Sequence, residues 1–347
     1  MKTQRVRIQR RPVHGVLLLD KPVGLSSNDA LQKAKWLLRA EKAGHTGTLD
    51  PLASGLLPLC FGAATKFSQV SLDADKRYTA TLRLGQTTTT GDAEGELLLE
   101  RPVTHSAERL GQILAGFLGP IAQVPPMYSA LKHEGKALYA YARAGVTIER
   151  EARQVTIHAL NLVESAGDRL VLDVVCSKGT YVRTLAEDIG EALGCGAHLS
   201  ALRRTGSGPL DVAQAVPLAT LTEMEEARRE ALLLPPDALL QEWPAVRLPA
   251  DEAGKFLSGM RRRIKLADAP QVRVYGPSQE DRTVKDLPDD DLGALHDVLL
   301  GSAHVQAGEL IADRLLSPPE VAALIALTQR SEACMPVPQN ESNRVSS

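Results

Sequence analysis

The chain has 347 residues, of which 44% are hydrophobic and 24% are charged, and its formal net charge is -2 at pH 7. A chain of this length can bury a sizeable core and suggests two or three domains. The near-neutral total gives no global sign of a nucleic-acid partner. No segment reaches the ~20 apolar residues that a transmembrane helix needs, so we expect no membrane partner.

Cysteine usage and the N-terminal segment predict a cytoplasmic protein. The four cysteines (Cys60, Cys176, Cys195 and Cys334) are scattered, with no CxxC and no histidine pair at ligand spacing. This pattern indicates a reducing compartment and argues against a zinc site. The apolar run that follows the basic N-terminus, residues 16–19, is far too short for a signal peptide.

Charge is distributed unevenly along the chain. Residues 1–11 and 255–265 each hold five basic side chains and no acid, whereas residues 280–297 hold seven acids and two bases. A basic patch on a neutral protein is what an RNA-binding surface requires. A solvated face explains any one patch equally well.

The first predicted elements are a strand and a basic amphipathic helix. The run VLLL at 16–19 is typical of a buried strand, and the turn sequence DKPVG at 20–24 ends it. Residues 26–28 (Ser, Ser, Asn) are candidate N-caps of a helix over 29–42, whose apolar side chains fall on one face.

Three further strands and a second helix follow. Residues 56–61 resemble a strand that Pro58 interrupts, which predicts an edge position or a bulge. Residues 77–84 alternate cleanly between apolar and polar side chains, and 170–176 form another strong strand. Thr180 is placed to cap the helix that comes next.

Strands and helices mix without the strict alternation of a doubly wound parallel sheet. We therefore expect residues 12–240 to form one α+β domain on a mixed, mainly antiparallel sheet. Trp243-Pro244 is a plausible boundary. Strand-like pieces at 272–275 and 310–315 predict a small β domain over 245–316.

The stretch GHTGTLDPLASGLL, residues 44–57, places the lone carboxylate of Asp50 among three glycines. Pro51 holds Asp50 in an extended conformation, so the side chain could simply cap a short turn over 51–54. The glycines also allow a ligand or another backbone to approach closely. His45 lies five residues upstream with no paired ligand nearby, and a lone histidine is more often packed or solvated than functional.

Two other constellations have both a structural and a functional explanation. In KGTYVR, residues 178–183, Tyr181 could pack in the core and Arg183 could pair with Glu187 one helical turn later. Residues 126–153 interleave three of the six tyrosines with six basic or histidine side chains. That pattern suits stacking and phosphate contact with looped RNA, or an ordinary amphipathic helix with its loop.

The sequence contains no glycine-rich phosphate loop, catalytic-triad motif or metal signature. Three segments, however, closely resemble the bacterial tRNA pseudouridine-55 synthases, the TruB family: LLLDKPVGLSSNDALQKAKWLLRAEKAGHTGTLDPLASGLLPL, KRYTATLRLGQTTTTGDAEG and VVCSKGTYVRTLAEDIGEALGCGAHLSALRRTGSGP. The match runs in order across residues 15–210, and its motifs are very specific.

The resemblance implies an enzyme that isomerises a uridine in the T-loop of tRNA. It also implies an α+β catalytic domain of pseudouridine-synthase type, followed by a small C-terminal PUA-like β domain. No cofactor, metal or protein partner is needed for this reaction, and we expect a monomer whose partner is the tRNA T-arm. A tRNA-binding or tRNA-folding module with incidental isomerase activity is the alternative. An aspartate-dependent glycoside hydrolase would need a second catalytic carboxylate, which the matched motifs do not supply.

By the same resemblance, Asp50 is the catalytic aspartate, which attacks C1′ or assists departure of uracil through a glycal route. Tyr78 matches the tyrosine that stacks on the flipped uracil and is a proposed base near C2′, and Arg183 matches the arginine that holds the aspartate ionised and oriented. Tyr181 matches a second pocket tyrosine, and Leu202 matches an apolar pocket wall.

The remaining substrate-binding residues also follow from the resemblance. His45 matches the histidine that fills the gap left by the flipped base, and Lys21 and Pro22 match a turn that supports the active-site floor. Residues 125–153 correspond to an RNA-clamping insertion, in which we expect Lys132 and Lys136 to contact RNA. The complete set of predicted site residues is Asp50, Tyr78, Arg183, His45, Tyr181, Leu202, Lys21, Pro22, Lys132 and Lys136.

The C-terminal region departs from the family pattern. Arg261, Arg262 and Arg263 are plausible phosphate contacts of the small β domain. Residues 277–299 form an acidic insertion, and acids repel phosphate. We expect the tail 317–347 to contain one helix near 320–329 and to be partly disordered.

Overall fold

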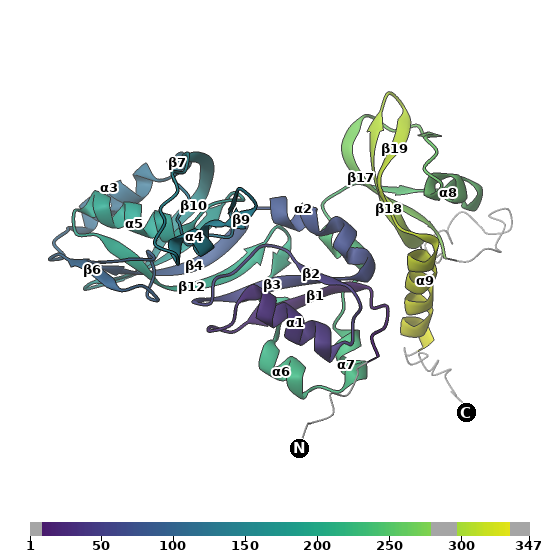
Figure 1. The fold of residues 1–347 in the computed structure, drawn as a ribbon. Coiled ribbons are helices and arrows are strands. Elements are labelled where there is room, and N and C mark those ends of the chain that lie inside the picture. The colour runs from purple at the N-terminus through teal and green to yellow at the C-terminus, as the bar shows by residue number, and fades with distance from the viewer. Residues whose placement is uncertain (1–8, 279–296, 334–347) are drawn as a thin grey trace, which may run out of the picture. The chain divides into compact units, whose positions relative to one another are not determined.

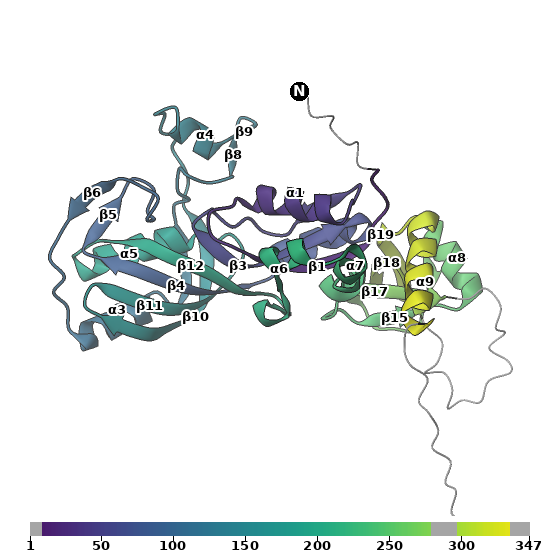
Figure 2. The same cartoon turned by 90° about the horizontal axis from the view of Figure 1, so that it is seen from below.

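A computed structural model describes residues 9–278 and 297–333 (Figures 1 and 2). The chain divides into two compact units, Met1–Leu234 and Pro235–Ser347. Each unit is described by itself. The functional division into a catalytic part over 12–240 and an RNA-binding part over 245–316 stays a prediction.

A ten-stranded sheet organises the first unit, with the strand order β14-β1-β3-β12-β4-β11-β10-β7 and with β13 and β2 attached to β12 and β3. Its strands are β1 Gly15–Lys21, β2 Ala43–His45, β3 Ala53–Phe61, β4 Lys76–Leu84, β7 Gly119–Gln123, β10 Arg153–Ala166, β11 Arg169–Cys176, β12 Ala197–Ser207, β13 Leu210–Asp211 and β14 Val216–Pro217. Only the pairs β1–β14 and β3–β12 are parallel within this sheet. The predicted α+β class with a mainly antiparallel sheet is therefore confirmed.

Two small hairpins and several helices complete the first unit. The hairpins pair β5 Gln86–Thr88 with β6 Leu97–Glu100, and β8 Lys132–His133 with β9 Lys136–Ala137. The helices are α1 Ser27–Leu37, α2 Ser68–Asp73, α3 Ala107–Gly116, α4 Leu138–Ala142, α5 Val182–Leu193, α6 Leu218–Glu223 and α7 Glu226–Ala231, with 3-10 turns η1 Gly62–Phe67 and η2 Val212–Gln214.

Two hydrophobic cores lie along the sheet, and Figure 1 shows a different set of helices beside each half. Helices α3 and α5 pack with β4, β10, β11 and β12 in one core, whereas α1 and α6 pack with β1 and β3 in the other. Tyr78 of β4 and Leu202 of β12 pack against both cores. The sheet therefore presents these two predicted site residues where the cores meet.

Helix α1 begins as its sequence predicts but ends earlier. Ser26 is the N-cap, and its hydroxyl accepts a hydrogen bond from the Asp29 amide. The predicted end at residue 42 is wrong, because Arg39 adopts a left-handed φ of 52° just after the C-cap Leu38. Helical hydrogen bonding cannot continue through that conformation.

The edge or bulge predicted from Pro58 is also wrong. Strand β3 runs through Pro58 in unbroken register with β1, where Pro58 pairs with Leu18. The Pro58 carbonyl accepts from the Thr46 amide on the opposite side, so the proline nitrogen faces that side too. On that side, β3 pairs with β12 only as far as Gly55 and with β2 only from Leu59 onward. The proline nitrogen, which has no hydrogen to donate, therefore lies in a gap between the two ladders, and no ladder hydrogen bond is lost.

The alternating strand 77–84 and the strand 170–176 are confirmed as β4 and β11, which pair with each other in the antiparallel direction. The predicted cap of α5 is wrong. Its N-cap is Tyr181, and the Thr180 hydroxyl instead donates to the Ser177 carbonyl in the preceding turn. A strand that turns this tightly into a helix needs that hydroxyl for the turn itself.

The second unit contains a five-stranded sheet in the order β15-β17-β18-β19-β16. Its elements are η3 Pro236–Leu239, β15 Ala245–Arg247, α8 Ala250–Leu257, β16 Arg262–Arg263, β17 Ala269–Pro277, β18 Asp297–Gln306, β19 Glu309–Leu315 and α9 Pro318–Ala333. The predicted strand pieces and the C-terminal helix are confirmed within β17, β19 and α9. No helix in the described part of the chain is long and apolar enough to cross a membrane.

The acidic insertion predicted over residues 277–299 is too long at both ends. Pro277 belongs to β17, and residues 297–299 belong to β18, because burial of Val298 and Leu299 places them in the sheet. The expectations for 279–296 and for 334–347 lie outside the described residues.

Candidate active site

A cavity of about 360 Å³ opens in the first unit, in the range typical of small-molecule sites (~300–1,000 Å³). It brings together side chains that are far apart in the sequence. Five of the predicted site residues line it: Asp50, Tyr78, Tyr181, Arg183 and Leu202. Further lining comes from Lys76, Arg204 and the segment 129–131 of the predicted clamp.

The floor of the cavity is set by the register of three adjacent strands. Arg204 of β12 pairs with Tyr78 of β4 on one side and with Gly55 of β3 on the other. Leu202 lies two residues earlier on the same strand, so its side chain shares the face of the sheet with those of Arg204 and Tyr78. Gly55 has a φ of 99°, and a Cβ there would lie 2.2 Å from the Arg204 carbonyl oxygen.

Asp50 lies on the loop that enters β3. The Ala53 amide donates to the Asp50 carbonyl at 3.0 Å, which closes a short turn through Pro51. Ser27 holds the start of this loop, because its hydroxyl bonds both the amide and the carbonyl of Leu49. The capping interpretation is therefore correct for the backbone turn only. The carboxylate itself points to Arg183, with 3.0 Å between Oδ2 and Nη2, and the side chain stays 45% exposed.

Arg183 is the most highly connected side chain of the site. It is 6% exposed, and its guanidinium also lies 3.4 Å from Asp92 Oδ2. Nη1 donates to the Thr90 carbonyl at 3.1 Å and Nη2 to the Tyr128 carbonyl at 2.6 Å. The structure pairs Arg183 with these groups rather than with Glu187, although the Arg183 charge still lowers the pKa of the Glu187 carboxyl.

Two opposing effects act on the Asp50 carboxyl. Burial raises its pKa, whereas the Arg183 charge lowers it, and Asp92 acts in the same direction as burial. Asp92 is itself held, because its Oδ1 accepts from the Thr90 hydroxyl at 2.6 Å and from the Glu94 amide at 3.1 Å. One arginine thus serves two carboxylates, a buried one that is fixed and a half-exposed one that faces the cavity.

Tyr181 is anchored to the base of the predicted clamp. The buried Gln123 side chain, at the end of β7, accepts from the Tyr181 amide at 3.1 Å and donates to its carbonyl at 3.4 Å. Burial raises the pKa of the Tyr181 phenol, which therefore stays neutral at physiological pH.

Lys21, Pro22 and His45 do not line the cavity. Lys21 is fully buried, and its ammonium donates to the carbonyls of Pro22 at 2.9 Å and Leu25 at 2.6 Å. Burial lowers the pKa of Lys21 to about 8, against the attraction of Asp50 and Glu94. The geometry agrees with a supporting role beneath the site rather than with contact to a ligand.

His45 is half-buried at the end of β2. Burial and the nearby Arg204 charge lower its pKa, so its ring is neutral at pH 7. Its Nδ1 is buried and has no hydrogen-bond partner within the described residues. Buried polar side-chain atoms are normally hydrogen-bonded, so this unpaired nitrogen is an exception.

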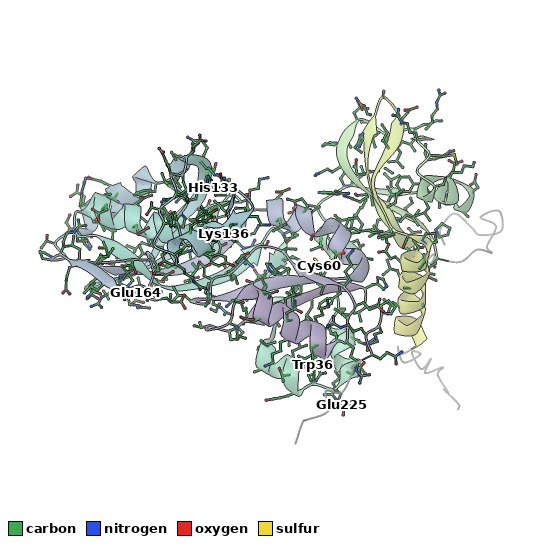
Figure 3. The ribbon with its side chains drawn as sticks, in the orientation of Figure 1. Trp36, Cys60, His133, Lys136, Glu164 and Glu225 are labelled. Atoms are coloured by element: carbon green, nitrogen blue, oxygen red, sulfur yellow. The ribbon has the colours of Figure 1, made fainter. Side chains whose placement is uncertain are left out.

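Lys132 and Lys136 lie in the β8–β9 hairpin, outside the cavity. Figure 2 shows that this hairpin and α4 project away from the sheet, and Figure 3 labels Lys136 with its strand partner His133. The Lys136 ammonium lies 4.7 Å from the centre of the Tyr141 ring, a cation–π arrangement. The amphipathic helix with its loop that was considered from the sequence is here a helix of only five residues, α4.

The sequence interpretation missed three residues of the site. Arg204 and Lys76 line the cavity, and Asp92 shares Arg183 with Asp50. Arg204 and Asp92 both fall inside the quoted motifs, so their position in LRRTG and TGDAEG was an available signal. Lys76 also falls inside a quoted motif, as the first residue of KRYTATLRLGQTTTTGDAEG.

In the second unit, two of the three predicted phosphate-contacting arginines form ion pairs. Arg261 lies 3.3 Å from Glu309, and Arg262 pairs with Glu252. Within residues 9–278 and 297–333, no group of three or more His, Cys, Asp or Glu side chains is arranged to hold a metal ion.

Comparison with known sequences gives a consistent result. Residues 35–182 match the model of the TruB family pseudouridylate synthase N-terminal domain, and residues 183–241 match that of the tRNA pseudouridylate synthase B C-terminal domain. The chain is 55% identical over 337 residues to tRNA pseudouridine synthase B of Verminephrobacter eiseniae, covering 95% of this chain and 97% of that protein. It is 57% identical over 316 residues to the same-named protein of Cupriavidus metallidurans, covering 90% and 98%.

Solved structures share the fold. A Cbf5-Nop10-Gar1 complex contains a chain with a TM-score of 0.64 and 25% identity, covering 92% of this chain and 87% of that one. An H/ACA RNP bound to a substrate RNA containing 2′-deoxyuridine contains a chain with a TM-score of 0.61 and 23% identity, covering 90% and 86%. At this identity the second likeness concerns the fold alone.

Proposed function

The chain belongs to the TruB family of pseudouridylate synthases, and from that premise we propose that it converts uridine 55 in the T-loop of tRNA to pseudouridine. The relatives at 55% and 57% identity are named tRNA pseudouridine synthase B, which supports tRNA as the substrate. The observation that carries the catalytic part is the Asp50 carboxylate, half-exposed in a cavity and held at 3.0 Å by a buried arginine.

The reaction is an isomerisation in which atoms and charge balance within the substrate. The N1–C1′ bond breaks, the uracil turns, and a C5–C1′ bond forms. C5 then loses its proton and N1 gains one. A carboxylate at C1′ divides this exchange into two easier steps, either as a nucleophile or by assisting loss of uracil through a glycal. We assign this role to Asp50.

Arg183 keeps Asp50 ionised and aimed into the cavity. Its charge opposes the effect of burial on the Asp50 pKa, and its contacts with Asp92, Thr90 and Tyr128 fix the guanidinium. A group held by that many partners needs little reorganisation during the reaction, which is how preorganised charges accelerate enzymes.

The other predicted residues divide between the base and the RNA. Tyr78 and Tyr181 present aromatic rings to a flipped uracil, with Leu202 as the apolar wall. The neutral ring of His45 replaces the stacking lost when the base leaves the T-loop, and Lys21 with Pro22 supports the floor. Lys132 and Lys136 on the projecting hairpin contact the phosphates of the T-arm.

A hydrolase would require a second carboxylate with access to the bound sugar. Asp92 shares Arg183 with Asp50, yet its side chain is 4% exposed and bonded to Arg183, Thr90 and the Glu94 amide. It is therefore unable to reach a substrate as a general acid. A tRNA-folding role that persists without isomerisation is the second candidate, and the clamp residues at 129–131 on the cavity wall favour it.

The test is mass-spectrometric mapping of pseudouridine in tRNA treated with purified wild type and with Asp50→Asn. We expect product at position 55 with wild type and none with the variant, while tRNA binding is retained. Asp173→Asn is the matched control, because Asp173 lies exposed on β11 and its carboxylate accepts a hydrogen bond from the Thr79 hydroxyl, away from the cavity lining. Pseudouridine formed by Asp50→Asn, or product at another position, would contradict the proposal.

A further inference from the structure

Arg204 is a buried cation with an unusual set of neighbours. It is 1% exposed, and no salt bridge within residues 9–278 and 297–333 joins it to a carboxylate. Burial lowers its pKa, and the Tyr78 phenol opposes that effect. A guanidinium buried without an opposite charge is expensive, so the surrounding structure must supply its stabilisation.

Two of its hydrogen bonds hold the loop that carries Asp50. Nε donates to the Leu56 carbonyl at 2.7 Å, and Nη2 donates to the Gly47 carbonyl at 3.2 Å. These carbonyls lie on either side of Asp50 in the sequence. One planar guanidinium therefore fixes both ends of the loop, which a lysine could not do in the same geometry.

The third partner is the phenol of Tyr78. The two residues are paired across β12 and β4, their side chains hydrogen-bond, and both line the cavity. Burial raises the pKa of the Tyr78 phenol, and Cys176 and Asp50 act in the same direction. Arg204 opposes them through its charge and its hydrogen bond, so it is the group that favours the phenolate.

We propose that Arg204 is a positioning residue that acts through Tyr78: it holds the phenol oxygen at the cavity and stabilises the phenolate that accepts a proton from the substrate. This inference rests on the proposed isomerisation. After the C5–C1′ bond forms, the C5–H bond breaks and its electron pair restores the C5–C6 double bond. Because the pKa of Tyr78 is raised, its resting phenol is neutral and first gives its proton to solvent. The phenolate beside Arg204 then accepts the proton from C5, which restores the neutral phenol, while N1 takes up a proton from solvent.

The experiment is a double-mutant cycle read by single-turnover release of tritium from tRNA containing [5-³H]uridine. The proteins are wild type, Arg204→Met, Tyr78→Phe and the double variant. We expect Arg204→Met to slow release about 100-fold when Tyr78 is present. In the Tyr78→Phe background the same change should alter the rate by less than about threefold, because the group through which it acts is gone.

A second measurement separates this role from loop support alone. The six tyrosines can be labelled with ¹³C at Cζ, and Tyr78→Phe assigns the Tyr78 signal. We expect Arg204→Met to move the Tyr78 titration up by at least about one pH unit, with a smaller shift in Arg204→Lys, which keeps the charge. Arg203→Met is the matched control, since Arg203 is the preceding residue, pairs with Asp20 at 2.7 Å and is exposed.

Equal losses of rate from Arg204→Met in both backgrounds would overturn the proposal and leave Arg204 as a support of the loop. An unchanged Tyr78 titration in a folded Arg204→Met or Arg204→Lys protein would overturn it as well. A wild-type protein that releases no tritium would instead refute the proposed function. The ¹³C titration would still report whether Arg204 lowers the pKa of the Tyr78 phenol. A failure of the proposed function can therefore be told apart from a failure of the role proposed for Arg204.

Discussion

The arginine that serves two carboxylates gives the sharpest prediction. Arg183→Met removes the charge but keeps an apolar side chain of comparable length. Asp92, with its side chain 4% exposed, is then an uncompensated buried charge, which costs about 3–5 kcal/mol. Asp50 keeps 45% of its side chain exposed, so water screens it and it contributes little to that loss.

A second substitution identifies which carboxylate is responsible. Asp92→Asn in the Arg183→Met background removes the unpaired charge and keeps a side-chain oxygen for the Thr90 hydroxyl and the Glu94 amide. The remaining cost is that of the Thr90 and Tyr128 carbonyls without their donor, about 1–3 kcal/mol for each, and Arg183→Met alone carries the same cost. We therefore expect the double variant to be more stable than Arg183→Met alone.

Thermal unfolding measures the loss of stability caused by the buried Asp92 charge, and single-turnover kinetics measures the loss of activity at Asp50. A loss of about 3–5 kcal/mol lowers the Tm of a unit of this size by about 6–20 °C, at about 2–4 °C for each kcal/mol. Activity should fall about 100-fold or more in both variants, because neither restores the partner of Asp50. A double variant no more stable than Arg183→Met would refute the assignment of the buried charge to Asp92. Recovery of activity with stability would refute the role of Arg183 in orienting Asp50.

Three further predictions concern the loop, the helix behind it and the clamp. Gly55→Ala should destabilise the protein by more than about 2 kcal/mol and suppress activity, because a Cβ at this position would lie 2.2 Å from a backbone oxygen. Gly111→Ala is the control, because a Cβ at Gly111 would meet no atom within 4 Å. Equal Tm values for the two variants would contradict the contact at Gly55. Burial raises the pKa of Glu187 from 4.5 to about 7. Between these two pH values the folded protein holds a proton on Glu187 that the unfolded chain has released. The free energy of unfolding therefore falls as pH rises from 4.5 to 7. Glu187→Gln should flatten the dependence of Tm on pH across that window, and an unchanged slope would argue against the shift. The double variant Lys132→Glu/Lys136→Glu should bind tRNA more weakly. The slope of log affinity against log salt concentration should become smaller by about 1 for each lysine, as measured by binding titrations at several salt concentrations. An unchanged affinity would show that neither lysine belongs to the RNA interface.

Local patterns in the sequence were sufficient for most of the elements. The alternation of β4 and the apolar run of β1 identified their strands, and Ser26 marked the start of α1. These signals are local, because burial on one face and satisfaction of the first helical amides depend on residues a few positions apart. The ends were less predictable: the left-handed Arg39 and the bond from Thr180 to Ser177 have no sequence signature of their own.

The motifs pointed to the site residues but not to their arrangement. The resemblance nominated Asp50, Tyr78, Arg183, Tyr181 and Leu202, and the structure gathers these five around one cavity. It placed Lys21 in a turn that supports the floor of the site, but gave no way to see that Lys21 is fully buried or that Lys132 and Lys136 lie on a hairpin outside the cavity. Those positions depend on how the loops leave the sheet.

What the sequence determined by itself was the class of fold, the main strands and helices, and the family, whose motifs make Asp50 the candidate catalytic aspartate. Only the tertiary structure decided how charges are shared around that aspartate. Asp92 reaches Arg183 from 91 positions away in the chain, and Arg204 reaches Tyr78 from 126 positions away, through the pairing of β12 with β4. Such contacts depend on sheet register and on the loss of solvent around a buried charge, neither of which exists before the chain has folded.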